Sequence, residues 1–190
     1  FRSTPVYFLQ DDHDHWENDS PLTYPVPWFQ LQLARTTQQL YYPEFLPDAT
    51  RSSGLPYSSS SARGDLSESF GTLRYGQLLE VLLYDVRRTL SVGELNAGFL
   101  DSNVEDWLVH RTASRDTRHL VHVPSNPPGW TAGKWGEWYP DMLHPETGEL
   151  TTQIPKPHWQ QGWLNQHDRI MQSLADMKHR NPLVIAGDLH

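Results

Sequence analysis

Short apolar runs that alternate with helix-like segments constrain the fold of this chain more than any other feature. The run at residues 77–87 is almost continuously apolar, which predicts a strand covered on both faces in a mixed or parallel sheet. Four runs are typical of strands because they are short, apolar and bounded by turn-forming residues: residues 5–9 (PVYFL), 77–87 (QLLEVLLYDVR), 119–124 (HLVHVP) and the run within 181–190 (NPLVIAGDLH).

Three segments between these runs are predicted to be helices. The first spans residues 28–42 and the second spans 103–116, with Asn103 as its N-cap. The third spans 157–180, where four apolar residues lie near helical spacing on one face: Trp163, Ile170, Leu174 and Met177. The order β, α, β, α, β, α, β predicts an α/β layered fold.

Two stretches are predicted to be irregular insertions. Residues 46–72 are rich in Ser, Gly and Pro, and residues 125–157 form a long Pro- and Trp-containing loop. A length of 190 residues fits one ordinary domain. We therefore expect residues 1–190 to belong to a single domain that carries these two insertions.

Composition and charge limit the partners. The formal net charge of −8 argues against a double-stranded nucleic acid held by a basic face, and it suits a bound multivalent cation better. The chain has no cysteine, so disulfides and thiolate metal ligands are excluded. No apolar run approaches membrane-spanning length, and no signal peptide is visible. Because the chain starts at Phe1 without Met and stops at His190 directly after an apolar run, we interpret it as a piece of a longer protein.

Two polar motifs follow predicted strands. QDDHDHWEND (10–19) crowds carboxylates and histidines whose like charges repel one another, and GDLH (187–190) places Asp188 and His190 two residues apart on one side of an extended loop. Asp and His ligate hard and borderline metals, and sites in α/β folds form where loops leave the carboxyl ends of strands. We expect the two loops to meet over a metal cluster. The alternative is that the acidic stretch is a solvated turn.

Four segments, in the same order, resemble the PhoD-like phosphatases of the calcineurin-like metallophosphoesterase superfamily. These segments are PVYFLQDDHDHWEND (5–19), LRYGQLLEVLLYDVRR (73–88), WGEWYPD (135–141) and LVIAGDLH (183–190). The resemblance implies an α/β sandwich of the metallophosphoesterase type, incomplete at the N-terminal side. It also implies two or more metal ions, calcium or iron or both, and hydrolysis of phosphate mono- or diesters in a small-molecule substrate.

The resemblance also assigns residues. Asp12, Asp188 and His190 match metal ligands, and His13 matches the histidine that acts near the leaving group. His122 matches an isolated metal-ligating histidine, with a structural role as the alternative. Arg87 is expected to contact a phosphate oxygen, with a salt bridge to an acid such as Asp85 as the alternative.

The family's first metal motifs lie upstream of its DDH segment, before the position of Phe1, so we expect this chain to be inactive alone. Export from the cytoplasm is implied by the resemblance only. A second hypothesis is a non-catalytic module that binds carbohydrate or lipid through the Trp-rich loop 127–140, with the acidic loop as a structural calcium site. That loop is equally expected to form a small core of its own. A third is a homologue that has lost its metals.

Overall fold

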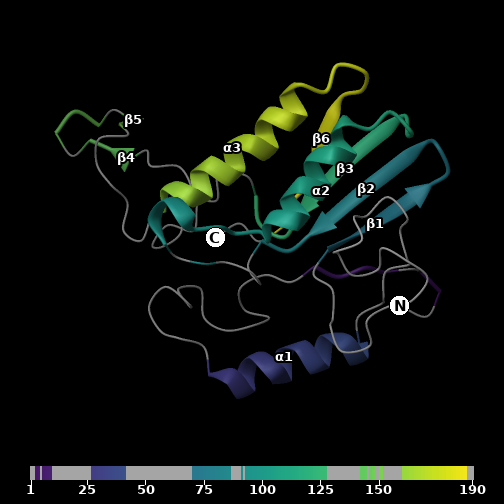
Figure 1. Cartoon of the computed structure of the whole chain (residues 1–190), viewed down its shortest axis with the longest axis horizontal. Coiled ribbons are helices and arrows are strands. Elements are labelled where there is room, and N and C mark those ends of the chain that lie inside the picture. Colours follow the sequence, from purple (N-terminus) through teal and green to yellow (C-terminus); the bar gives the residue numbers. More distant parts are fainter. Residues whose placement is uncertain are drawn as a thin grey trace.

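The computed structural model describes part of the chain, and every structural statement below concerns that part. The described residues are 3–4, 6–9, 27–41, 70–86, 91, 93–127, 142–144, 146–148, 150–151 and 160–187. They form three α-helices, α1 (Trp28–Tyr41), α2 (Ser102–Ala113) and α3 (Gln161–Ala175), one 3-10 turn, η1 (Glu94–Asn96), and six strands, β1 (Phe70–Tyr75), β2 (Leu79–Tyr84), β3 (His119–Pro124), β4 (Met142–Leu143), β5 (Leu150–Thr151) and β6 (Pro182–Val184) (Figure 1).

The main sheet has the strand order β1-β2-β3-β6 and is mixed. β1 pairs antiparallel with β2, and β2, β3 and β6 are parallel neighbours. In the register, Leu82 of β2 lies opposite His122 of β3, and His122 lies opposite Val184 of β6. The short strands β4 and β5 form a separate antiparallel pair. The α/β class and the mixed sheet predicted from the sequence are confirmed.

Most of the predicted strands and helices are confirmed with shifted ends. β2 and β6 lie within the predicted runs, β3 matches its prediction, and α1 covers almost the whole of its predicted range. α3 is shorter than predicted, but all four residues of its predicted apolar face are buried: Trp163, Ile170, Leu174 and Met177. The helix that forms α2 was expected to have Asn103 as its N-cap. The cap is instead Asp101, whose side chain accepts a hydrogen bond from the Asn103 backbone N–H at 2.9 Å.

Three expectations about strands were wrong. The stretch 125–157 was expected to be irregular, but it contains the antiparallel pair β4 and β5. Residues 6–9 have no regular secondary structure, although their run is apolar. A strand needs a hydrogen-bonded neighbour, and the pairings of the described sheets do not include this run. The segment 46–72 was expected to be irregular throughout, but its last residues open β1. β1 turns into β2 through Gly76, whose φ of 54° suits glycine, and the turn is closed by Leu78 N–H donating to the Tyr75 carbonyl at 3.0 Å.

The core lies between one face of the sheet and the helices α2 and α3. Leu82 and Tyr84 of β2 and Leu120 of β3 alternate onto this face, where they pack against Trp107 of α2 and Trp163 of α3. Figure 1 shows α2 and α3 running side by side along the sheet. The helices are joined further by Gln166, whose buried amide oxygen accepts the backbone N–H groups of two residues that precede α2, at 2.8 and 2.9 Å. Apolar packing and these hydrogen bonds therefore fix α2 and α3 against this face of the sheet.

The opposite face of the sheet is also apolar. Val81, Val121 and Val123 alternate onto it and are half-buried, and Leu183 of β6 is 50% exposed. A sheet with two apolar faces is suited to be one layer among several. No helix in the described ranges is long and apolar enough to cross a membrane.

Candidate functional site at the carboxyl ends of the parallel strands

The parallel strands β2, β3 and β6 end at one edge of the sheet, which we call the carboxyl edge. Asp85 follows β2 directly, and Asn126 lies two residues after β3. Both are polar and almost completely buried, at 2% and 0% exposure. The described part of the segment after β6 ends at Gly187, just before Asp188. The carboxyl edge therefore gathers the exits of three strands, as sites in parallel sheets require.

Hydrogen bonds fix these exits relative to one another. Ser125 N–H donates to the Tyr84 carbonyl at 3.0 Å, and the Ser125 hydroxyl oxygen accepts from Val86 N–H at 3.0 Å. On the other side of β3, Ile185 N–H donates to the His122 carbonyl at 2.9 Å. The parallel pairing thus continues past the ends of the strands, and side chains on the exits are held in defined positions.

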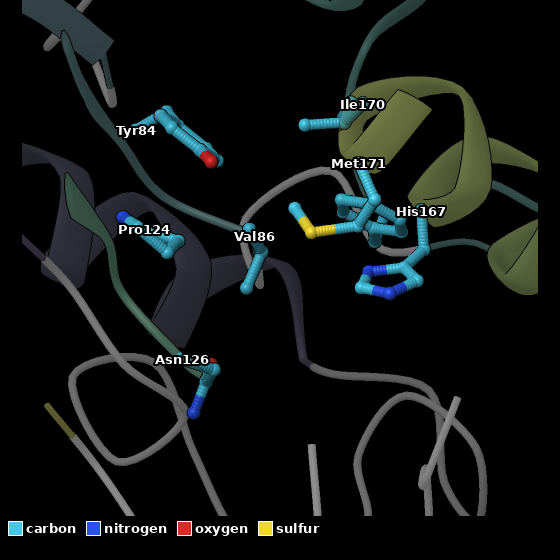
Figure 2. A pocket seen from close by; sticks show the side chains of 8 residues that line it. Tyr84, Val86, Pro124, Asn126, His167, Ile170 and Met171 are labelled. Atoms are coloured by element: carbon cyan, nitrogen blue, oxygen red, sulfur yellow. The ribbon is translucent and has the colours of Figure 1, made fainter. Parts of the chain in front are cut away.

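A small cavity of about 10 Å³ lies behind the carboxyl edge, which is roughly the space that one water molecule needs. Figure 2 shows Tyr84 on one side of it and the α3 side chains on the other. The lining is mostly apolar, and its residues are Tyr84, Val86, Phe99, Pro124, Asn126, His167, Ile170 and Met171. Burial lowers the pKa of His167, opposed by the nearby charge of Asp168. A neutral imidazole is therefore part of the cavity wall.

His122, which the resemblance proposed as a metal ligand or a structural residue, is completely buried in the middle of β3. Its Nδ1 lies 3.2 Å from the Tyr84 hydroxyl and its Nε2 lies 3.0 Å from the Thr112 hydroxyl. Burial, followed by the positive charge of Arg180, lowers the pKa of His122 to about 4. A histidine ligand must offer a ring nitrogen to the metal, and here both nitrogens have hydroxyl partners. The geometry favours the structural alternative.

The remaining residues predicted for the site are Asp12, His13, Arg87, Asp188 and His190, and all of them lie outside the described residues. Their convergence on one cleft stays a prediction. Within the described ranges, no group of three or more His, Asp or Glu side chains is placed to hold a metal ion.

Tyr84 and His167 are site-bordering residues that sequence reasoning did not single out. His167 is buried, at 1% exposure. The signal was present, because His167 lies four residues after Trp163 and three before Ile170, on the buried face of α3. The position of Tyr84 against the cavity depends on the pairing of β2 with β3, which no local pattern reveals.

A second buried polar cluster lies at the opposite, amino end of the parallel strands. The Arg111 guanidinium of α2 bonds both carboxylate oxygens of Glu80, at 2.9 and 2.6 Å, and also contacts Asp116 at 2.9 Å. Arg180, which precedes β6, donates to Thr117 at 2.6 Å and to backbone carbonyls at the end of α2. Through these hydrogen bonds Arg111 links α2 to Glu80 of β2, and Arg180 links the end of α2 to the segment before β6.

Comparisons with known proteins returned no relative. No family model, no curated protein and no solved structure matches the chain.

Proposed function

We propose that the chain is part of a metal-dependent hydrolase of phosphate mono- or diesters, of the PhoD-like kind. One observation carries the proposal. β6 is a parallel neighbour of β3, so that the described chain up to Gly187 leaves the sheet at the same edge as Asp85 and Asn126, directly before Asp188 in the sequence. This is the edge at which α/β enzymes assemble their sites.

The donor set fits a metal. Asp12, Asp188 and His190 offer carboxylate oxygens and an imidazole nitrogen, the ligands of hard and borderline cations, and the chain has no thiolate. When bound, such cations polarise phosphoryl oxygens and lower the pKa of bound water. The half-exposed apolar face of the sheet supports the metallophosphoesterase sandwich as the finer fold, because a further layer would cover it.

The other proposed residues act on the substrate. His13, when protonated, donates its proton to the leaving oxygen. Arg87 follows the buried Asp85 by two residues, and its guanidinium binds a phosphate oxygen as a planar donor. Asp85, two residues before Arg87, is held at the carboxyl edge by the hydrogen bonds of its neighbours Tyr84 and Val86 with Ser125.

The test is hydrolysis of p-nitrophenyl phosphate and of its bis-ester, with and without a chelator. It should be run on the chain and on a longer protein that includes whatever is encoded upstream of Phe1. We expect no activity from the chain alone, and chelator-sensitive activity from the longer protein that Asp188→Ala and His190→Ala each abolish. The matched controls are Asp106→Ala and His110→Ala, which remove an exposed carboxylate and an exposed imidazole from α2.

Failure has a clear form. A folded longer protein that hydrolyses neither ester with calcium, iron, manganese or zinc added would refute the proposal and favour the binding module. Activity that survives both Asp188→Ala and His190→Ala would remove GDLH from the site.

A further inference from the structure

We propose that His122 is a positioning residue: as a neutral imidazole with its proton on Nε2, it holds the Tyr84 ring in the wall of the cavity at the carboxyl edge. The inference rests on the proposed function only in that the cavity borders the proposed site. The hydrogen-bonded series on which it depends joins β2, β3 and α2.

The direction of the hydrogen bonds in this series is set at Thr112. The Thr112 hydroxyl donates to the Leu108 carbonyl at 2.7 Å, one turn back along α2. A hydroxyl has one proton, so toward His122 the Thr112 oxygen can only accept. The nitrogen that faces it at 3.0 Å, Nε2, must therefore carry the proton.

The other half of the ring follows from this. With the single proton of a neutral imidazole on Nε2, Nδ1 has a free lone pair, and the Tyr84 hydroxyl 3.2 Å away donates to it. Each of the three protons in this hydrogen-bonded series then has an acceptor. The Tyr84 hydroxyl donates to His122 Nδ1, His122 Nε2–H donates to the Thr112 hydroxyl oxygen, and the Thr112 hydroxyl donates to the Leu108 carbonyl. The opposite tautomer would leave the buried Tyr84 hydroxyl proton without an acceptor in this series, a cost that favours the first tautomer by roughly tenfold or more.

The consequence is a fixed side chain at the cavity. Tyr84 is the last residue of β2 and is 2% exposed, and its ring meets the His122 ring edge-on with centroids 5.7 Å apart. The backbone around Tyr84 is also tied to Ser125. His122 therefore sets the orientation of Tyr84 through the hydroxyl, while the backbone hydrogen bonds set its place.

The test is nitrogen NMR of the ¹⁵N-labelled 190-residue chain at pH 7, with the His122 resonances identified by their absence in His122→Gln. We expect a protonated Nε2 and an unprotonated Nδ1. We also expect the Tyr84 hydroxyl proton to be protected from exchange with water, and His122→Leu to remove this protection. Thr112→Val takes away the acceptor of Nε2–H and should shift the tautomer population, whereas Thr112→Ser keeps the hydroxyl and should leave it unchanged.

Three results would overturn the inference. The first is a proton on Nδ1 in the unaltered chain, and the second is a Tyr84 hydroxyl proton whose exchange rate neither His122→Leu nor Thr112→Val changes. The third is a shift of the His122 nitrogen resonances when zinc or calcium ions alone are added. Resonances that stay fixed under added metal support it. The NMR result is independent of hydrolysis, so a protein without phosphoesterase activity but with this tautomer would refute the proposed function and keep the inference.

Discussion

Replacing Arg111 with methionine is expected to destabilise the protein strongly, because Arg111 is the cation that neutralises a completely buried carboxylate. Glu80 is 0% exposed, and its side-chain hydrogen bonds within the described residues come from the Arg111 guanidinium, at 2.9 and 2.6 Å. Methionine keeps much of the aliphatic volume of the side chain, so that loss of packing contributes little. The change therefore isolates the electrostatic role.

The magnitude follows from burial. Removing one partner of a buried ion pair leaves the other charge without compensation and costs about 3–5 kcal/mol. Arg180 adds a positive charge near the cluster and offsets part of this. Asp116 also loses a partner, but its side chain is 40% exposed and it keeps Arg74 at 3.1 Å. Against a total stability of about 5–15 kcal/mol, the loss is large.

Urea unfolding followed by circular dichroism measures the effect. The matched control is Arg169→Met, which also breaks an Arg–Glu pair. There the Arg169 side chain is 58% exposed, and Glu105, at 8% exposure, keeps the hydrogen bond from the Gln166 amide at 2.8 Å. We expect that control to cost less than Arg111→Met, because one member of its pair is already largely in water and Glu105 keeps a second hydrogen-bond donor. The double variant Glu80→Leu with Arg111→Met should recover most of the loss, because apolar residues replace a buried pair at little cost. An Arg111→Met loss no larger than that of Arg169→Met, or a double variant no more stable than the single one, would refute this reasoning.

Three further predictions concern stability. Gly162→Ala should lower the urea midpoint, because a Cβ there would lie 2.1 Å from the Ala97 carbonyl oxygen and overpacking costs about 1–3 kcal/mol or more. This cost exceeds the gain of about 1 kcal/mol in helix propensity from glycine to alanine. A raised midpoint would contradict the close approach of α3 to η1. The folded-state pKa of His122, about 4, lies below its ordinary value of 6.5, so protonation of His122 favours the unfolded chain. About 3 kcal/mol of stability should therefore be lost as the pH falls from 6.5 toward 4. Urea unfolding curves across this pH range should show the loss in the unaltered chain and not in His122→Gln; the same loss in both would contradict the prediction. Gln166→Leu should cost at least about 2 kcal/mol because it strips the acceptor from two buried backbone N–H groups, and hydrogen exchange should speed up at these groups; unchanged exchange would contradict their dependence on Gln166.

Local patterns predicted the elements whose signal is complete within a few residues. β3 and the buried face of α3 could be read directly, because strand alternation and helical spacing are properties of single segments. β1 was not predicted because FGTLRY contains a glycine and only one large apolar residue, Leu73, between its aromatic ends. Its pairing with β2 is what makes it a strand. The run at 5–9 failed for the converse reason, since an apolar composition does not supply a neighbouring strand.

Side-chain partnerships between elements could not be predicted. Glu80 and Arg111 are 31 residues apart in the sequence, and only the packing of α2 on β2 shows that they neutralise each other. The contacts of His122 depend likewise on the register between β2 and β3. For the candidate site, the sequence placed GDLH correctly after a strand of the parallel set, because the motif adjoins the apolar run that forms β6. The roles of Asp188 and His190 stay predictions.

The metal content of the purified protein is the most direct test of the central claim, that the GDLH motif at the carboxyl edge belongs to a metal centre. It should be measured by elemental analysis after desalting, on the longer protein that includes any upstream coding sequence. We predict bound metal in the unaltered protein, a clear loss of it in Asp188→Ala and in His190→Ala, and no loss in the α2 control His110→Ala. Equal metal content in all of these proteins, or none in the unaltered one, would contradict the account.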